Sequence, residues 1–285
     1  IVMLCSLPLL VTSVGFLRNG SGFQGVLNHP QAFGLAMGTF TAWSAARLLE
    51  ARRPTWIQVG LTGIGLAMVL MSGARTAGLA IVLAVALAVT VKLLLKAGRV
   101  QDFAPGFLTP RFWITAFIGF LAGVGAAGSL WQAIQQFLVK GTGRRGSILD
   151  LYDVARGALI DAMMANISND PWRGIGFGIA SIPSLMVVER DSFLGLPTGA
   201  AVEKGIAPLA VLEETGIVGF VFVLVWVAWL FVRGAKGGLA SLTVLLMVLI
   251  LNFGENTLFS PGGYGLLAIV LFGWVCASGA QQRHV

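Results

Sequence analysis

The chain has 285 residues, of which 56% are hydrophobic and only 11% are charged, and its formal net charge is +7. Soluble globular domains contain about 25% charged residues, so this composition excludes an ordinary soluble protein. The positive charge is weak evidence for nucleic-acid binding, because no nucleic-acid-binding motif accompanies it and basic residues anchor membrane proteins at the cytoplasmic face. Cys5 and Cys276 both lie in apolar segments, which argues against a disulfide framework.

Apolar segments of about 20 residues recur along the sequence, and each is long enough to cross a hydrocarbon core of about 30 Å. They predict an all-α fold, a polytopic integral membrane helical bundle that forms a single membrane domain over residues 1–285. Ile1 begins directly inside an apolar run, so we expect earlier spans to precede this stretch of the protein. The seven or eight predicted spans are 1–17, 31–49, 56–72, 76–95, 112–130, 207–232, 239–255 and 262–279.

Basic residues at the ends of these spans predict the orientation of the chain. Short cytoplasmic loops are enriched in Lys and Arg. One set of short span ends carries ten basic residues, whereas the opposite set carries only Arg18 and Arg75. We therefore expect the first set to face the cytoplasm, which places the segment 131–206 on the outer side. The ten residues are Arg47, Arg52, Arg53, Lys92, Lys96, Arg99, Arg111, Arg233, Lys236 and Arg283.

The segment 131–206 contains no apolar run of span length and is predicted to form one large outer loop with short helices. Apolar residues at helical spacing form a stripe on one of these helices, which should end at residues 169–171. Arg156 falls inside the stripe, whereas Asp161 and Ser168 fall on the opposite face. Such an arginine either extends along the membrane surface or points toward an anionic group. The stripe consists of Ile148, Leu151, Tyr152, Ala155, Leu159, Ile160 and Met163.

The sequence lacks the usual motifs of cofactor and metal sites. The segment GIGFG (174–178) has neither the strand–turn–helix setting of a dinucleotide site nor the Lys-Ser/Thr pair of a nucleotide-phosphate loop. Its glycines indicate instead a backbone that can approach a ligand closely. No HExxH motif, CxxC motif or acidic pair at metal-ligand spacing occurs. We therefore expect neither a cofactor nor a metal ion.

Three arginines, Arg18, Arg75 and Arg156, are the candidate residues for binding an anion on the outer side. Arg18 and Arg75 oppose the usual charge distribution, and Arg75 lies in the tight link SGAR between two spans. They either extend to the membrane interface or bind a lipid phosphate. A guanidinium can bind phosphate through two parallel hydrogen bonds, so we favour a lipid diphosphate as the ligand.

Three further residues are candidates for acid–base chemistry. His29 either begins a helix ahead of Pro30, or contacts a phosphate or activates an acceptor hydroxyl. Glu203 and Glu214 flank the start of the span that follows the outer loop. They either stabilise the helix N-terminus through its dipole, or one of them accepts a proton from a sugar hydroxyl.

Four segments, RNGSGFQGVLNHPQAFG, MSGART, NDPWRGIGFG and LEETGIVG, occur in this order along the chain. Together they resemble the O-antigen ligase and O-antigen polymerase family of bacterial envelope polysaccharide synthesis, and the resemblance covers nearly the whole chain. It implies a metal-independent membrane glycosyltransferase of the GT-C type in the bacterial inner membrane, with a periplasmic active site. Such an enzyme contributes to lipopolysaccharide or exopolysaccharide biosynthesis.

The resemblance also implies substrates and roles. A glycan would pass from undecaprenyl diphosphate to lipid A-core or to a second lipid-linked glycan, with Arg75 and Arg156 binding the diphosphate. Ligases of this family carry a histidine where this chain has Gly205, so the ligase mechanism does not transfer at that position. Glu203, Glu214 or His29 could replace it. The alternative function is a transporter or flippase of an anionic lipid-linked glycan, which would use the same arginines for binding only.

Overall fold

The computed structural model describes residues 1–17, 22–95, 100–114, 157–185, 187–190, 197–201, 204–259 and 263–281. The chain forms two compact units. The first consists of Ile1–Ala116, Val227–Asn252 and Thr257–Val285, and the second of Phe117–Trp226 and Phe253–Asn256. Helix α10 (Ala207–Lys236) contributes residues to both units.

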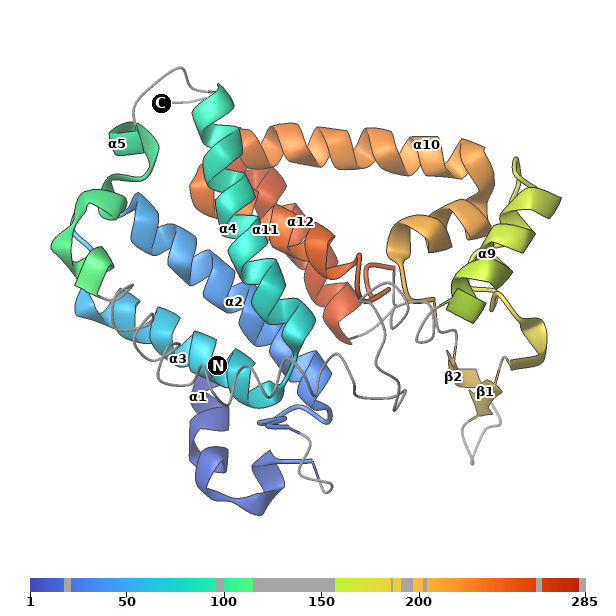
Figure 1. Cartoon of the computed structure of the whole chain (residues 1–285), viewed down its shortest axis with the longest axis horizontal. Coiled ribbons are helices and arrows are strands. Elements are labelled where there is room, and N and C mark those ends of the chain that lie inside the picture. The colour runs from blue at the N-terminus through green and yellow to red at the C-terminus, as the bar shows by residue number, and fades with distance from the viewer. Residues whose placement is uncertain are drawn as a thin grey trace, which may run out of the picture. The chain divides into compact units, whose positions relative to one another are not determined.

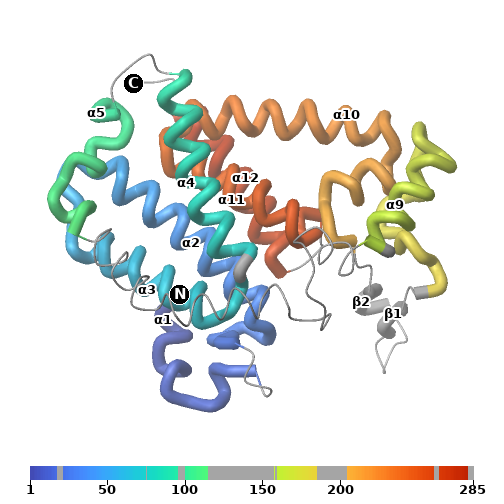
Figure 2. Tube along the Cα trace, viewed as in Figure 1, coloured from blue at the N-terminus to red at the C-terminus, as the bar shows by residue number. Residues whose placement is uncertain are grey.

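Helices α2, α3, α4 and α11 form the core of the first unit, and α12 packs against α11 and α2. Helices α2 and α3 lie side by side, as the views in Figures 1 and 2 show. Their hydroxyl groups also meet, because Ser44 Oγ and Thr62 Oγ1 lie 2.7 Å apart. The helices are α2 (Pro30–Glu50), α3 (Trp56–Ser72), α4 (Arg75–Leu95), α11 (Leu239–Leu251) and α12 (Gly263–Gln281).

Small residues let α2, α4 and α11 approach closely. A Cβ atom added at Gly38 of α2 would lie 3.1 Å from Ala77 Cβ of α4 and 3.0 Å from Met247 Cε of α11. Small residues at such positions are typical of helix packing in membranes, where close backbone approach replaces the hydrophobic effect between helices. On α4 the fully buried face is a stripe of alanines, namely Ala77, Ala80, Ala84 and Ala88.

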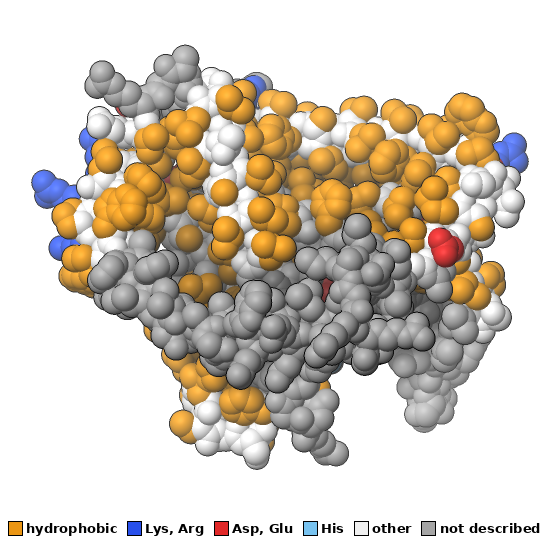
Figure 3. Space-filling view, viewed as in Figure 1, with side chains coloured by type: hydrophobic (Ala, Val, Ile, Leu, Met, Phe, Trp, Pro, Cys, Tyr) orange, Lys and Arg blue, Asp and Glu red, His pale blue; other side chains and the backbone are white. Residues whose placement is uncertain are grey.

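Three described helices are long and apolar enough to cross a membrane: Thr76–Leu95, Ala207–Lys236 and Gly263–Gln281. This confirms the apolar helices predicted at 76–95, 207–232 and 262–279. Figure 3 shows hydrophobic side chains covering α4 and the long part of α10, with few described charged groups on this face. Such surfaces require an apolar environment, since soluble proteins rarely expose apolar patches of this extent.

The other predicted spans match the observed helices to different extents. Helices α2 and α3 match 31–49 and 56–72, whereas α11 ends at Leu251, before the predicted end at 255. Segment 1–17 is divided, because Pro8 lacks an N–H group and a 3-10 helix begins around it. Its elements are α1 (Val2–Ser6), η1 (Leu7–Val11) and η2 (Ser13–Gly15). The prediction 112–130 lies mostly outside the described residues, and the total number of spans stays a prediction.

Span ends that were predicted on one side of the membrane meet in the first unit. Lys92, near the end of α4, donates to Ala235 O at the end of α10 at 2.5 Å. Ala240 N, at the start of α11, donates to Glu50 Oε1 at the end of α2 at 3.0 Å. The alternation of the spans across a membrane stays a prediction. The short elements α5 (Val100–Phe103) and η3 (Pro105–Leu108) follow α4.

The second unit contains α9 (Ala158–Asn169), η5 (Pro183–Leu185), a pair of strands and the first part of α10. Strands β1 (Val187–Arg190) and β2 (Pro197–Ala201) pair antiparallel, with Val187 opposite Ala201. Apart from this pair, the described regular structure is helical, as predicted. The placement of 131–206 as a periplasmic loop stays a prediction, and residues 131–156 lie outside the described part.

Candidate functional site

The first candidate site, which we call the junction, joins the segment 15–30 to the turn 71–75 between α3 and α4. Phe23 N donates to Met71 O at 2.9 Å. The Phe23 side chain is fully buried, and its ring packs edge-on against Phe33 of α2, with 5.2 Å between centroids. A backbone hydrogen bond therefore joins the segment to this turn, and an aromatic contact joins it to α2.

The flanks of Arg18 pair within the junction. Leu17 N donates to Gly22 O at 3.2 Å, so the two residues on either side of 18–21 lie next to each other. Gly22 is close to the turn, because a Cβ atom there would lie 2.5 Å from Ser72 O. Arg18 itself lies outside the described residues. The described residues Gly22 and Phe23 that follow it lie close to the turn that precedes Arg75.

The turn that leads into α4 is fixed by its own sequence. Gly73 adopts a left-handed conformation with φ 67°, which glycine reaches without steric cost. Ser72 Oγ donates to Val69 O at 2.7 Å and accepts from Ala74 N at 3.2 Å. Helix α4 then begins at Arg75. The backbone of Arg75 is thus placed at a helix start within the junction, in agreement with the tight link predicted from SGAR.

His29 is the N-cap residue of α2. Its Nδ1 accepts from Gln31 N at 3.2 Å, its side chain is exposed, and Pro30 follows as the first helical residue. Pro30 also lies near Gly22, since a Cβ on that glycine would be 3.1 Å from Pro30 Cβ. The predicted helix-start role of His29 is confirmed, and its role in acid–base chemistry stays a prediction.

The second candidate site is a buried ion-pair cluster in the second unit, formed by Lys204, Glu213 and Glu214. Lys204 Nζ lies 2.7 Å from Glu213 Oε2 and 3.0 Å from Glu214 Oε1. The side chains of Lys204 and Glu213 are fully buried, whereas that of Glu214 is 10% exposed. Two carboxylates thus share one ammonium group away from bulk water, where charges need partners.

Glu213 is held by neutral donors in addition to the lysine. Asn166 Nδ2 donates to Glu213 Oε1 at 2.7 Å and also to Ser181 O at 2.9 Å. Ser181 Oγ donates to Glu213 Oε2 at 2.9 Å. The carboxylate therefore ties α9, the segment after it and α10 together, which is a structural role.

Glu214 has fewer contacts and reaches the surface. Its Oε2 accepts from Gly178 N at 3.1 Å, and its Oε1 contacts the lysine of the cluster. A carboxylate offers about four lone-pair sites, so these two contacts leave acceptor capacity on both oxygens. Of the two neighbouring acids, Glu214 is the one that can still receive a proton from a ligand.

The cluster lies beside a break in α10 at Gly216, where the backbone has φ 64° and ψ −173°. Figure 1 shows the short first part of α10 meeting the long part at a sharp angle. Glu213 and Glu214 end the first part, so they are not in the first turn of α10, although they precede the start of its long part. The break frees backbone groups that need partners.

The glycine-rich loop 170–178 supplies those partners. Ile175 N donates to Glu213 O at 2.9 Å, and Gly176 N donates to Glu214 O at 3.0 Å. In return, Ile217 N donates to Pro171 O at 2.8 Å. The segments NDPWRGIGFG and LEETGIVG, which are far apart in the sequence, are therefore complementary parts of one structure.

Glycine is required on both sides of this contact. At Gly174 (φ +70°) an added Cβ atom would lie 2.5 Å from Glu213 O, and at Gly216 it would collide with Trp172 O. Both positions are left-handed, which disfavours any residue with a Cβ atom. The two segments thus need these glycines in order to pack against each other, and no bound nucleotide is needed to explain why glycine occurs there.

Helix α9 carries the stripe that the sequence predicted. Met163 is fully buried, whereas Asp161 and Ser168 are exposed, and the helix ends at Asn169. These predictions are confirmed for the described part of the helix. Asn166 follows Met163 by three residues and continues the buried face. A polar residue on the buried face of α9 was the sequence signal that could have identified Asn166 as a hydrogen-bond partner of Glu213.

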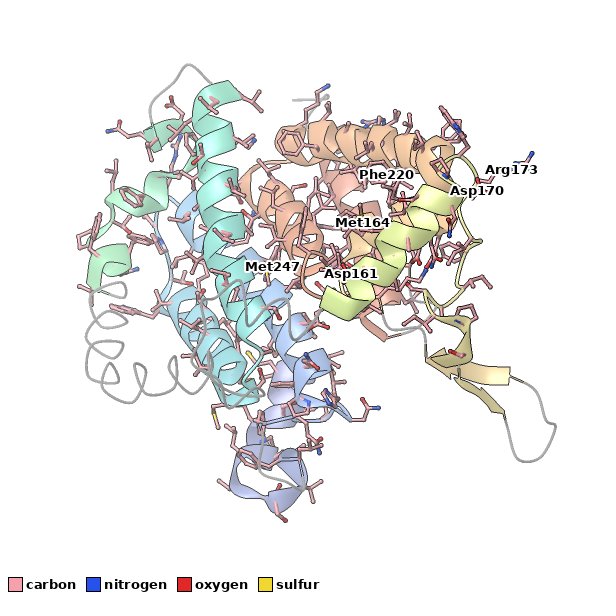
Figure 4. All side chains as sticks on the ribbon, turned by 45° about the vertical axis from the view of Figure 1, so that its right-hand side comes forward. Asp161, Met164, Asp170, Arg173, Phe220 and Met247 are labelled. Carbon is pink, nitrogen blue, oxygen red and sulfur yellow. The ribbon has the colours of Figure 1, made fainter. Side chains whose placement is uncertain are left out.

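Asp170 and Arg173, which follow α9, have exposed side chains. Figure 4 shows Asp161 and Met164 along α9, and Arg173 pointing outward beyond Asp170. Asp170 Oδ1 accepts from Arg173 N at 3.1 Å, which stabilises the turn. The exposed Arg173 side chain was not among the predicted site residues.

Three predicted site residues, Arg18, Arg156 and Glu203, lie outside the described part of the chain, and the side chain of Arg75 is not described either. Among the described residues, no group of three or more His, Cys, Asp or Glu side chains could hold a metal ion. Lys204 and Ser181 were not predicted as site residues, and Ser181 lies 32 residues before its partner Glu213. A comparison with models of known protein families finds no match, and neither does a comparison with curated proteins.

Proposed function

We propose that this protein is an integral membrane glycosyltransferase of the O-antigen ligase and polymerase type. It moves a glycan from undecaprenyl diphosphate to an acceptor hydroxyl at the periplasmic face of a bacterial inner membrane. The acceptor is lipid A-core or a second lipid-linked glycan. The reaction breaks the bond between the sugar C1 and the diphosphate oxygen and forms a bond between C1 and the acceptor oxygen.

The observation that carries the proposal is the junction. Charge distribution alone selected Arg18 and Arg75 as basic residues on the outer side, and 56 residues separate the two in the sequence. The flanks of Arg18, the cap residue His29 and the helix start at Arg75 all belong to this one compact region. A lipid diphosphate has enough charge to occupy two guanidinium groups there.

The arginines contribute chiefly to the departure of the diphosphate. Negative charge grows on the leaving oxygen as the sugar bond breaks, so cationic groups bind the transition state more strongly than the ground state. Arg156 is assigned to the same diphosphate. No metal ion is part of the proposed mechanism, since the guanidinium groups supply the positive charge.

Glu214 is the proposed acceptor of the hydroxyl proton. It is the partly exposed member of the ion-pair cluster, and its carboxylate keeps free lone-pair sites. Glu203 and His29 are the alternatives for this step. Glu213 instead supports the loop 170–178 and the break in α10.

The test uses the gene in a strain that lacks its own copy, with surface polysaccharide separated by gel. We expect Arg75→Ala and Arg156→Ala to abolish long-chain or ligated glycan, while carrier-linked glycan accumulates outside the inner membrane. The accumulated species distinguishes a polymerase from a ligase. Arg52→Ala is the matched control, because Arg52 is exposed and predicted to face the cytoplasm.

Two outcomes would overturn parts of the proposal. A normal glycan pattern in both variants at matched protein levels would remove the assigned role of the arginines. Accumulation of carrier-linked glycan on the cytoplasmic side would favour a transporter or flippase, which uses the same residues without transferring the sugar.

A further inference from the structure

A groove in the first unit takes no part in the proposed reaction. It has a volume of about 350 Å³ and lies between α2, α11 and α12. The residues that line its walls recur at helical spacing on α2 and on α12, so one face of each of these two helices forms a wall. These wall residues are Ala36, Phe40 and Trp43 of α2 and Leu267, Leu271 and Trp274 of α12.

The floor of the groove offers no free polar group. Val244 of α11 is buried there, and Thr39 contributes the one hydroxyl among the lining residues. That hydroxyl donates to Leu35 O at 3.0 Å and lies 2.6 Å from Tyr264 Oη. No lining residue is charged. The groove is therefore lined mainly by apolar groups and has no charged side chain to bind a phosphate, so hydrocarbon is the ligand that suits it.

We propose that this groove binds one acyl chain of a membrane phospholipid. Helix α12 is long and apolar enough to cross a membrane, and Leu266 and Val270, which neighbour the groove on α12, are 58% and 61% exposed. The groove thus lies on a helix with an outward apolar surface. An apolar cavity disfavours water, so the surrounding hydrocarbon is the solvent that fills it.

The dimensions of the groove fit part of an acyl chain. From Ala36 to Trp43 the helix axis rises by about 10 Å, roughly a third of a hydrocarbon core of about 30 Å. Aromatic rings line this length, and the rings of Phe40 and Trp43 have centroids 5.9 Å apart. The volume is also within the range of about 300–1,000 Å³ that ligand sites occupy. This binding requires membrane insertion but not glycosyl transfer.

The test uses the complete protein in vesicles of phosphatidylethanolamine and phosphatidylglycerol. The vesicles contain a trace of phosphatidylcholine with a photoactivatable diazirine on one acyl chain. After illumination and digestion, mass spectrometry locates the label. We expect label between residues 36 and 43 to fall several-fold in the groove-filling variants Ala36→Leu and Leu267→Phe. Leu266→Phe, on the adjacent exposed position, should leave it unchanged.

Three results would overturn the inference. The first is equal labelling of groove and neighbouring residues in the unaltered protein, and the second is a loss that is as large in Leu266→Phe. The third is competition by added undecaprenyl phosphate but not by unlabelled phospholipid, which would assign the groove to a polyprenyl chain. Circular dichroism and thermal unfolding identify a variant that fails to fold. If one groove-filling variant fails to fold, the other still tests whether filling the groove reduces the labelling.

Discussion

The junction and the ion-pair cluster are held together by different kinds of contact. In the junction, backbone hydrogen bonds, glycines and the buried Phe23 hold the described structure together, and none of these contacts requires an arginine. In the cluster, Lys204 and Glu213 are fully buried and hold each other. The described structure of the junction is therefore held by uncharged groups, whereas in the cluster charged side chains maintain the structure.

The largest expected effect is on the cluster. Lys204→Met leaves two buried carboxylates without their ammonium partner, and loss of one member of a buried ion pair costs about 3–5 kcal/mol. We expect a decrease of that size in the free energy of unfolding, measured by denaturant in detergent micelles. The control Lys236→Met removes an exposed lysine of α10 and should change stability by about 0.5 kcal/mol or less. Equal effects of the two substitutions would contradict a structural cluster.

The second effect concerns the break in α10. Gly216→Ala costs about 1–3 kcal/mol for a backbone conformation (φ 64°, ψ −173°) that essentially only glycine adopts, and the collision with Trp172 O adds to this. Gly178→Ala serves as control, because Gly178 has φ +74° but no atom within 4 Å of an added Cβ. Thermal unfolding should show the larger loss for Gly216→Ala. A larger loss for Gly178→Ala would mean that the loop does not pack on the break as described.

The third effect appears in activity and not in stability. Arg75→Ala should lower glycan transfer about 10- to 100-fold, since a hydrogen bond to a charged group contributes about 1.5–3 kcal/mol. Arg75→Lys should lose less, because it keeps the charge but not the paired geometry. The measurement is the transfer rate of purified protein with a lipid-linked glycan, alongside its melting temperature. A parallel loss of stability would make Arg75 a structural residue.

The smallest effect separates capping from chemistry at His29. Loss of an N-cap side chain typically costs about 1 kcal/mol, so His29→Ala should be destabilised by that amount. His29→Asn should recover it, because an asparagine side chain can accept the same hydrogen bond from Gln31 N. We expect His29→Asn to retain glycan transfer, measured with the same assay as for the Arg75 variants. Loss of transfer at normal stability would make His29 a participant in the reaction.

The sequence predicted helices better than contacts. Hydropathy located α4, α10 and α12, helical spacing located the buried face of α9, and the helix-breaking residues 169–171 located its end. It did not predict the division of segment 1–17 at Pro8, because that segment has span-like hydropathy. Nor did it identify Lys204 as the partner of Glu213, since Lys204 precedes the first residue of α10 and so has no place in the periodic pattern of that helix.

The sequence by itself determined the apolar helices of span length and the residues whose charge needs an explanation, because both depend on local composition. Tertiary structure alone decided what those residues contact. The loop NDPWRGIGFG fits the break at Gly216 because left-handed glycines and freed backbone groups meet there. The same packing engages Glu213 fully and leaves Glu214 partly exposed, a difference between adjacent residues that arises from the fold around them.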